Sequence, residues 1–383
     1  MNTETNVEII KRTKCCICGS FSLIESLKIC SFPIYMGTTT SDPSLDLFMD
    51  QKWVMCEKCG CLQLLELLPL SLIYQSNHST EVVGEIWRDH HNAFAEFIAQ
   101  HKPTKILEIG AAHGYLASTL TEKLPEVEYT IIEPDSSLVN SKIKVIKGFI
   151  EENIQEVGGK DCIIHSHVLE HIYEPVEFIK QIASNADMNC EMYISFPNFR
   201  GLIESGALNS LNFEHTYLLD PTHAQIIFKN CGFSILESAT YLSHSYFYRL
   251  KKTSAINANL ETFSNIGPQS NKFIEMVNDL SNFVFSANDK IKNHKGPVYL
   301  FGAHVFSQAL LALGLDTSKI IGILDNSHDK QSKRLYGTSY KVFSPSVIRN
   351  QSNSLVVLNA SHYQDEIRAQ LKQIDKNLVI IEN

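Results

Sequence analysis

A short apolar run, a glycine turn and an amphipathic segment follow one another in TKILEIGAAHGYLASTLTEKLP, which begins at Thr104. The run from Lys105 to Ile109 has the length and composition of a buried strand, and apolar residues after Gly114 recur at helical spacing. A Rossmann-type unit begins in this way, so the segment predicts an α/β fold.

Further segments extend the pattern. Apolar strands are expected at residues 128–132, 144–146, 161–165 and 192–196, and a helix is expected to start near Pro221. Helical spacing continues from about residue 258 to 294. After it, GPVYLFGAHVFSQALLALGL repeats the order of strand, glycine turn and helix, and the next strand ends at Asp325. We therefore expect a second, C-terminal Rossmann-like domain.

Size and charge limit the partners. The 383 residues exceed the roughly 250 to 300 at which one core stops growing, so two or three domains are expected. A net charge of −9 argues against a nucleic-acid backbone as the main partner, because phosphate binding needs clustered Lys and Arg. The first residues lack the apolar core of a signal peptide, and no apolar run approaches the ~20 residues that a bilayer requires. We expect a cytoplasmic protein with a small-molecule substrate and no membrane partner.

Seven of the ten cysteines fall before residue 62, and four of them form two Cys-x-x-Cys-Gly pairs. The pairs are Cys15 with Cys18 and Cys56 with Cys59. Each pair is typical of a turn that presents two thiolates to one ion, and two such turns supply the four soft ligands of tetrahedral zinc. Because four thiolates fill the coordination sphere, the expected zinc is structural.

Other cysteines lie nearby. Cys16 and Cys61 fit neither pair, whereas Cys30 is a candidate substitute ligand. Unligated buried thiols and a redox pair are the alternatives to zinc. The redox pair is disfavoured, because no strand and helix surround either Cys-x-x-Cys.

The first glycine turn predicts a nucleotide site. Gly110 permits close approach of the backbone to a ligand, and Glu108 at the end of the strand can face a cation such as a sulfonium-bearing amino acid. Glu133 follows about 25 residues later, where a carboxylate accepts hydrogen bonds from both ribose hydroxyls. The turn GAAHG lacks the Gly-x-Gly-x-x-Gly spacing that cradles a pyrophosphate, which disfavours a dinucleotide. Phe149 is expected to cover the adenine.

Together these segments resemble class I methyltransferases, and specifically the sugar C-methyltransferases of antibiotic and surface-polysaccharide pathways. The resemblance covers almost the whole chain and rests on CCICGS, CEKCGCLQ, LEIGAAHG, IIEP, HVLEHIYEP and FEHTY. It implies a zinc-binding domain over residues 1–75, an S-adenosylmethionine-dependent methyltransferase domain over 76–250, and a helical linker with a substrate-binding domain over 251–383. The implied adenosylmethionine contacts are Glu108, Gly110, Ala112, Gly114, Glu133, Pro134, Phe149 and His167.

The resemblance also implies a reaction. A dTDP- or GDP-linked 4-keto-deoxysugar would be methylated on the carbon next to its keto group, through an enolate. Glu214 and His215 match a pair in the family's sugar pocket, where the histidine is implicated as the base. A histidine with an ordinary pKa near 6.5 can accept a proton at neutral pH, and a methyl group held in line then transfers by displacement. A hydrogen-bonded structural histidine is the alternative.

Two further segments match the sugar pocket. His167, Glu170 and His171 also spell the H-x-x-E-H of inverted zinc proteases, which would place both histidines on one helical face. The position at a strand end and the lack of a clear third ligand disfavour a protease, and we expect His171 to line the substrate cleft. Tyr74, with His78, matches a segment that reaches over the sugar, although a packing role is an equal alternative for Tyr74.

The substrate contacts are less closely matched. Asn212 stands where the family often has a tyrosine, and the turn GAHVFSQ and the segment NASHY depart from the family's forms. The C-terminal domain is implied to hold the nucleotide-sugar, and a purely structural domain is the alternative. The expected contacts are Asn198, Asn212, Tyr217, Gly302, Ala303, His304, Asp325 and Asn326.

Two alternatives to this function stay open. One is O- or N-methylation of a nucleotide sugar or surface polysaccharide, in which His215 deprotonates or orients a hydroxyl. The other is a non-catalytic nucleotide-binding scaffold.

Overall fold

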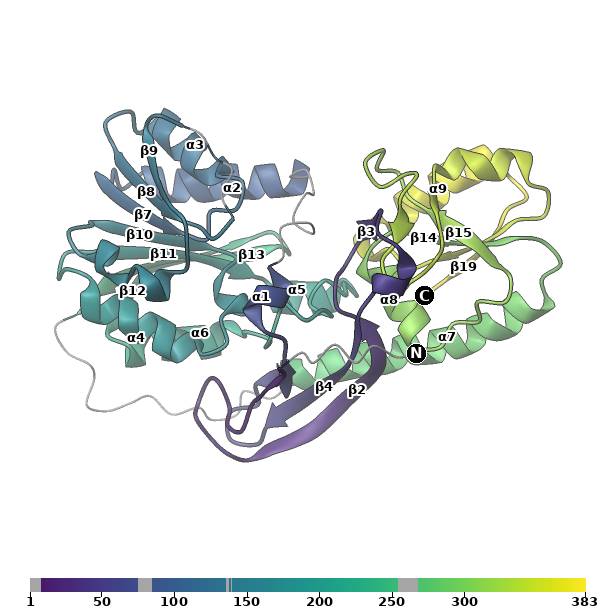
Figure 1. The fold of residues 1–383 in the computed structure, drawn as a ribbon, viewed down its shortest axis with the longest axis horizontal. Coiled ribbons are helices and arrows are strands. Elements are labelled where there is room, and N and C mark those ends of the chain that lie inside the picture. Colours follow the sequence, from purple (N-terminus) through teal and green to yellow (C-terminus); the bar gives the residue numbers. More distant parts are fainter. Residues whose placement is uncertain (1–7, 75–84, 136–137, 139, 254–267) are drawn as a thin grey trace.

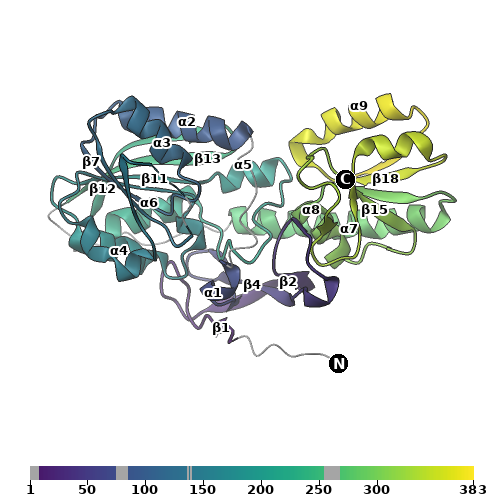
Figure 2. The ribbon, with the colours of Figure 1, turned by 45° about the horizontal axis from the view of Figure 1, so that its top comes forward.

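The computed structural model describes residues 8–74, 85–135, 138, 140–253 and 268–383 of the chain. Figure 1 shows two α/β domains side by side, joined by a β-rich N-terminal module and a long helix. Figure 2 shows the same module lying below both domains. None of the helices in the described ranges is long and apolar enough to cross a membrane.

The central domain contains a seven-stranded sheet with the order β12-β13-β11-β10-β7-β8-β9. The strands β7 to β11 are parallel, and β13 runs antiparallel to both β11 and β12. The strand order reverses beside β7, and open α/β sheets bind ligands at such a point. The strands are β7 (Lys105–Ile109), β8 (Glu128–Ile132), β9 (Ile143–Ile146), β10 (Cys162–Ser166), β11 (Glu191–Pro197), β12 (Phe233–Tyr241) and β13 (Ser245–Lys252).

Helices cover both faces of this sheet. Alternate strand residues point to opposite faces, so Ile164 packs with Phe94 of α2 whereas Ile163 packs with Phe178 of α4. The sheet is therefore buried on both sides, which confirms the predicted α/β fold. The helices are α2 (Glu85–Ala99), α3 (Tyr115–Lys123), α4 (Pro175–Asn185), α5 (Phe199–Glu204) and α6 (Pro221–Asn230).

Most expected elements of this domain are present. β7 and β8 have the expected bounds, β9 differs by one residue at its start, β10 and β11 differ by one residue at each end, and α6 begins at Pro221. β13 continues to Lys252, past the boundary expected at residue 250. The expectation that His167 and His171 share a helical face is wrong. His167 has φ of 53°, and the 3-10 turn that follows spans only Leu169–His171.

The N-terminal module is built on the antiparallel sheet β2-β4-β5. Its last strand also pairs with the central domain, because Leu64 N–H donates to Thr216 O and Leu218 N–H donates to Leu62 O, each at 2.9 Å. The segment 216–218 thus lies beside β5, where Tyr217 forms an isolated antiparallel bridge with Gln63. The elements are β1 (Ile10–Lys11), β2 (Leu23–Pro33), β3 (Thr38–Thr39), β4 (Phe48–Cys56), β5 (Leu62–Leu64), β6 (Glu66–Leu67) and α1 (Leu70–Ile73).

The C-terminal domain is a five-stranded parallel sheet with the order β17-β15-β14-β18-β19. The order confirms the second Rossmann-like half. The linker helix begins at Pro268 in the described chain, and residues 258–267 of the expected helix lie outside the described ranges. The elements are α7 (Pro268–Asn293), β14 (Val298–Phe301), α8 (Val305–Ala312), β15 (Ile320–Leu324), β16 (Arg334–Leu335), β17 (Val342–Phe343), β18 (Leu355–Leu358), α9 (Gln364–Ile374) and β19 (Val379–Glu382).

One apolar core joins the three parts. Phe273 of α7 is 1% exposed, and its ring centre lies 5.8 Å from that of Trp53 in β4 and 5.7 Å from that of Phe199 in α5. The same cluster continues to Val298 and Leu300 of β14. The module, the central domain and the C-terminal domain therefore share buried surface.

A buried ion pair fixes the module to the C-terminal domain. The Arg334 guanidinium donates to both carboxylate oxygens of Asp46, at 2.6 and 2.7 Å, and Nε donates to Ser41 O at 2.7 Å. Their side chains are only 9% and 2% exposed. Gly337 N–H donates to the same carboxylate at 2.8 Å, so the pair is well satisfied.

Replacing Arg334 with Met should lower the free energy of unfolding by about 3 to 5 kcal/mol, because Asp46 is left buried without its cation. Urea denaturation measures this change. Asp365→Asn is the matched control, since Asp365 is paired with Arg368 in the same domain but its side chain is 90% exposed. We expect it to cost at most about 1 kcal/mol. Equal losses in the two variants would contradict the assignment.

Candidate active site

A left-handed turn follows β7. Gly110, Ala112 and Gly114 have φ of 72°, 46° and 69°, a conformation that strains the one residue with a Cβ. Glu133 at the end of β8 holds this turn, because Ala112 N–H donates to its Oε2 at 2.9 Å. Asp135 N–H donates to its Oε1 at 3.2 Å. The turn and the acid thus meet at the carboxyl edge of the sheet, where the strand order reverses.

Glu108 lies beneath the turn, inside β7. It is 2% exposed, and its Oε2 accepts a hydrogen bond of 2.7 Å from the Tyr129 hydroxyl. Desolvation raises the pKa of Glu108 to about 7. A bound cation would favour the ionised form of this carboxyl group.

The other expected cofactor residues differ in their surroundings. Pro134 is exposed, and Phe149 is half-buried ahead of a 3-10 turn. His167 is held by protein groups, since its Nδ1 lies 3.1 Å from Glu170 Oε1 and its Nε2 lies 2.8 Å from Ser245 Oγ. A contact between His167 and a cofactor would therefore compete with Ser245.

Substituting Ala for Gly110 should destabilise the turn by about 1 to 3 kcal/mol. The added Cβ would lie 2.5 Å from Val168 Cγ2, at a residue whose φ is already left-handed. Urea denaturation of Gly110→Ala measures the loss. Gly206→Ala is the control, since Gly206 has φ of 66° but nothing within 4 Å of a Cβ. If both variants lose the same amount, contact with Val168 is not the cause.

A carboxylate and two imidazoles gather near this edge. Glu170, His171 and His215 each have one ligand-type atom within 4.8 Å of the others. The rings of His171 and His215 meet edge to face, with centres 4.9 Å apart. Glu214 Oε2 lies 4.0 Å from His171 Nδ1, at the margin of an ion pair. His171 and His215 therefore form one cluster with Glu170 and Glu214.

Burial sets the protonation of this cluster. Desolvation lowers the pKa of His171 to about 3, with a smaller contribution from His215. Desolvation also lowers the pKa of His215, while Glu170 opposes that change. Both imidazoles are therefore neutral at neutral pH, which is the form that accepts a proton.

Asn212 holds the turn that carries the Glu-His pair. Its Oδ1 accepts hydrogen bonds of 2.7 Å from the backbone N–H groups of both Glu214 and His215. Its Nδ2 donates to Asn209 O at 2.7 Å, and the residue is 2% exposed. This expected substrate contact is thus committed to the backbone and positions the pair.

Two other expected contacts are also committed. Tyr217 is 1% exposed, and its hydroxyl donates to Leu169 O. Asn198 is 6% exposed, and its Oδ1 caps α5 by accepting from Gly201 N–H at 3.0 Å. Both side chains therefore support the local fold in this structure.

Tyr74 lies at the end of α1. Desolvation and then the carboxylates of Glu214 and Glu170 raise the pKa of its hydroxyl, and the residue is 44% exposed. The Glu214 charge therefore acts on the Tyr74 hydroxyl. His78 lies outside the described residues.

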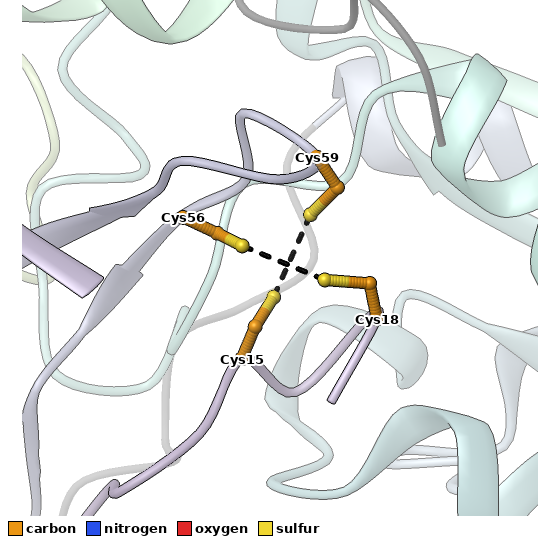
Figure 3. A group of neighbouring side chains, drawn as sticks. All are labelled: Cys15, Cys18, Cys56 and Cys59. Atoms are coloured by element: carbon orange, nitrogen blue, oxygen red, sulfur yellow. Dashed lines mark hydrogen bonds between the residues drawn. The ribbon is translucent and has the colours of Figure 1, made fainter. Parts of the chain in front are cut away.

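The two cysteine pairs converge, as Figure 3 shows for Cys15, Cys18, Cys56 and Cys59. The Sγ atoms of Cys15 and Cys59 are 3.6 Å apart, and those of Cys18 and Cys56 are 3.5 Å apart. An ion with four sulfurs at about 2.3 Å in a tetrahedron places those sulfurs about 3.8 Å from one another. The thiols present therefore fit a tetrahedral ion with little adjustment.

The N-terminal module also contacts the central domain and the linker helix. His223 Nε2 of α6 donates to Cys59 O at 2.8 Å, and Ser270 Oγ of α7 donates to Gly60 O at 2.6 Å. Arg12 Nη2 donates to Thr216 Oγ1 at 3.1 Å. The thiolate cluster is thus packed against the segment that carries His215.

The second glycine turn has the same construction as the first. Gly302 has φ of 101°, and Ala303 N–H donates to Asp325 Oδ2 at 2.8 Å. Ser327 N–H donates to the other carboxylate oxygen at 2.9 Å. His304 is the residue before α8. The Asp325 carboxylate is therefore already bonded to the backbone, like Glu133.

An open cavity of about 300 Å³ lies between the central and C-terminal domains. On the C-terminal side Asn359 follows β18, is 5% exposed, and has no hydrogen-bond partner for its Nδ2 among the described residues. The lining residues are Ser205, Gly206, Asn359, Ser361, Gln364, Asp365, Arg368 and Asn383.

For several residues of this region no function was predicted from the sequence. Glu170 was noticed only as part of a metal pattern, although its carboxylate lies between two groups of histidines. The sequence motif suggested no third ligand, yet His90 and His244 lie beside His167, and His215 lies beside His171. The two histidines of H-x-x-E-H thus serve different clusters, which explains why a protease reading of this motif does not fit.

Two family models match the chain. Residues 80–238 match a model described as a methyltransferase domain, and residues 255–379 match one described as a C-methyltransferase C-terminal domain. A comparison with curated proteins gives no match.

Solved structures are similar over the central part. The plantazolicin methyltransferase BpumL in complex with SAH is 15% identical, with a TM-score of 0.38, over 44% of this chain and 86% of that chain. Human N-acetylserotonin methyltransferase in complex with SAM is 15% identical, with a TM-score of 0.39, over 45% and 53%. The mitomycin 7-O-methyltransferase MmcR is 14% identical, with a TM-score of 0.36, over 43% and 54%.

Proposed function

We infer that this methyltransferase transfers the methyl group of S-adenosylmethionine to carbon. Its class I α/β fold and its two matched domains identify it as a methyltransferase. The proposed acceptor is the carbon next to the keto group of a dTDP- or GDP-linked 4-keto-deoxysugar. The observation that carries the proposal is the pair of neutral imidazoles, His171 and His215, beside Glu170. The C-methyltransferase description of the C-terminal match supports carbon as the acceptor.

The residues of the first glycine turn fit adenosylmethionine. The left-handed backbone at Gly110 leaves room for close approach of a ligand. Glu133 lies where a carboxylate accepts hydrogen bonds from ribose hydroxyls. Glu108 beneath the turn would favour a cationic group above it. When bound, adenosylmethionine supplies a methyl group on a positively charged sulfur.

His215 is the proposed base. It takes the proton from the carbon beside the keto group, and the electron pair of that bond forms the enolate. Adenosylmethionine held by the first glycine turn and Glu133 would supply the methyl group to this carbon, and the electrons of the broken carbon–sulfur bond would stay on sulfur. Glu170 favours the protonated form of His215 through its charge, and Asn212 fixes the backbone of His215.

We propose that the nucleotide part of the substrate binds at the carboxyl end of β14 and β18. The strand order of the C-terminal sheet reverses between these strands, and the unpartnered amide of Asn359 lies there. Gly302 and His304 belong to the adjacent turn. The cavity beside Ser361 and Ser205 supports this location.

O- or N-methylation of a nucleotide sugar is the second candidate. Asn212 replaces a tyrosine that the resembling family often has, which changes the surface near the acceptor. In this case His215 would deprotonate or orient a hydroxyl, and an enolate would not form.

Substituting Ala for His215 should lower the turnover number by about 100- to 10,000-fold, the usual contribution of general base catalysis. The wild type should also exchange the hydrogen on the keto-adjacent carbon with deuterium from solvent in the presence of S-adenosylhomocysteine. Mass spectrometry of the recovered sugar nucleotide measures that exchange, and His215→Ala should abolish it.

His328→Ala is the control for this experiment, because His328 is exposed in the C-terminal domain. It should keep both turnover and exchange. Near wild-type turnover in His215→Ala would remove His215 as the base. Methyl transfer by the wild type without any exchange would favour the O- or N-methylation candidate.

We further propose that Cys15, Cys18, Cys56 and Cys59 bind one structural Zn²⁺. Their spacing supports the ion, and four thiolates leave no open position for chemistry. The ion would fix the turn before β5, whose backbone pairs with Thr216 and Leu218. Zinc would thus act on catalysis by positioning the segment next to His215.

Replacing Cys59 with Ser should remove this zinc and lower both thermal stability and turnover, because the turn before β5 loses its anchor. Elemental analysis of unchelated protein measures the metal. Cys30→Ser is the matched control, since Cys30 is exposed and lies outside the cluster. Loss of zinc in Cys30→Ser with retention in Cys59→Ser would overturn the assignment.

A further inference from the structure

Three imidazoles from distant segments converge beside the central sheet. His90 lies in α2, His167 follows β10, and His244 lies in the turn between β12 and β13. Their ring centres are 5.0 Å apart for His90 and His167, 4.8 Å for His90 and His244, and 5.4 Å for His167 and His244. One ring nitrogen from each lies within 4.8 Å of the other two.

These separations suit one ion. A tetrahedral ion with imidazole nitrogens at about 2.0 to 2.1 Å places the ring centres about 5 Å from one another. The cluster therefore has the dimensions of a three-histidine metal site.

Two of the rings are oriented through one nitrogen by a serine hydroxyl, and the third has a polar neighbour at both nitrogens. His90 Nε2 lies 2.9 Å from Ser195 Oγ, and His244 Nδ1 lies 2.6 Å from Ser245 Oγ. His167 Nδ1 lies 3.1 Å from the Glu170 carboxylate, and its Nε2 lies 2.8 Å from Ser245 Oγ, a hydroxyl that an ion on Nε2 would displace. Metal-bound histidines are commonly held in this way, by a carboxylate or another polar group on the second nitrogen.

His90 supplies an independent observation. The residue is fully buried, and its Nδ1 has no hydrogen-bond partner among the described residues. An unpaired polar atom in such a place costs free energy, typically about 1 to 3 kcal/mol. A ligand on Nδ1 would remove this cost, and an ion shared with His167 and His244 is the ligand that the geometry allows.

Trp87 covers the cluster from α2. Its ring centre lies 4.7 Å from that of His167 and 4.8 Å from that of His244, in edge-to-face contacts. The indole limits the access of water to the three rings. A site of this kind holds an ion in a partly dry environment.

We propose that His90, His167 and His244 bind a divalent transition-metal ion, with Zn²⁺ as the preferred ion and one coordination position left for a non-protein ligand. This site is separate from the four cysteines. It also touches the candidate base, because Glu170 contacts His167 and belongs to the cluster of His171 and His215. An ion on His167 draws electrons from the ring, which favours a hydrogen bond from Nδ1 to the Glu170 carboxylate 3.1 Å away.

The test is the zinc content of the full-length protein after incubation with Zn²⁺ and removal of the excess by gel filtration. With both sites filled we expect about two ions per chain, and about one in His244→Ala or His90→Ala. His328→Ala should keep the wild-type content, as an exposed histidine outside the cluster. The Cys59→Ser variant should lose a different ion and keep the one bound by histidines.

Replacement by Co²⁺ separates the two sites by spectrum. The cysteine site gives intense sulfur-to-cobalt charge-transfer bands in the near ultraviolet, which three imidazoles cannot give. His244→Ala should lose only the part of the visible d–d absorption that comes from the histidine site and should keep the charge-transfer bands. If His90→Ala fails to fold, His244→Ala still decides, because its side chain lies in a turn.

Two results would overturn the proposal. One is a metal content and a cobalt spectrum that are the same in the wild type, His244→Ala and His90→Ala. The other is wild-type protein whose bound metal is lost entirely in Cys59→Ser. The proposed methyl transfer can fail or hold independently of both, since the measurements contain no substrate.

Discussion

Two backbone hydrogen bonds between β5 and the segment 216–218 hold the candidate base in place. Leu64 N–H and Leu218 N–H are the donors, and they tie the N-terminal module to a loop that has no regular partner of its own. On its other side Thr216 N–H donates to Glu170 O at 3.2 Å. The Glu-His pair therefore lies between the cysteine turns and the residues after β10. Because this loop is hydrogen-bonded on both sides, it keeps its polar rings at fixed separations although it is neither a helix nor a strand.

Much of the fold could be predicted because continuous apolar runs mark buried parallel strands. Lys105–Ile109 and Glu128–Ile132 were expected at their observed bounds, since each run is ended by a glycine or proline turn. The cysteine pairs could be predicted equally well, because the spacing of two ligands within one turn is set by the local sequence. The strands and the cysteine pairs could both be predicted because residues that are close in their sequence are also close in space.

The rest depended on contacts between distant residues. Nothing near Asn212, Tyr217 or Asn198 indicates that their polar groups bond to backbone atoms and not to a substrate. His90 and His244 lie in no motif, and they meet His167 only because α2 and the turn after β12 pack at the same edge. H-x-x-E-H misled for a related reason. A left-handed residue at its start breaks the helical face that the spacing suggests.

The contacts of Phe273 join the N-terminal module, the central domain and the C-terminal domain. Its ring contacts Trp53 of the module and Phe199 of the central domain, while its helix lies against the C-terminal sheet. A truncated chain that ends between the two matched domains would leave both of these rings without a cover and expose a continuous apolar surface to water. The parts are thus units of sequence, whereas the unit that must be expressed, purified or transplanted is the whole chain.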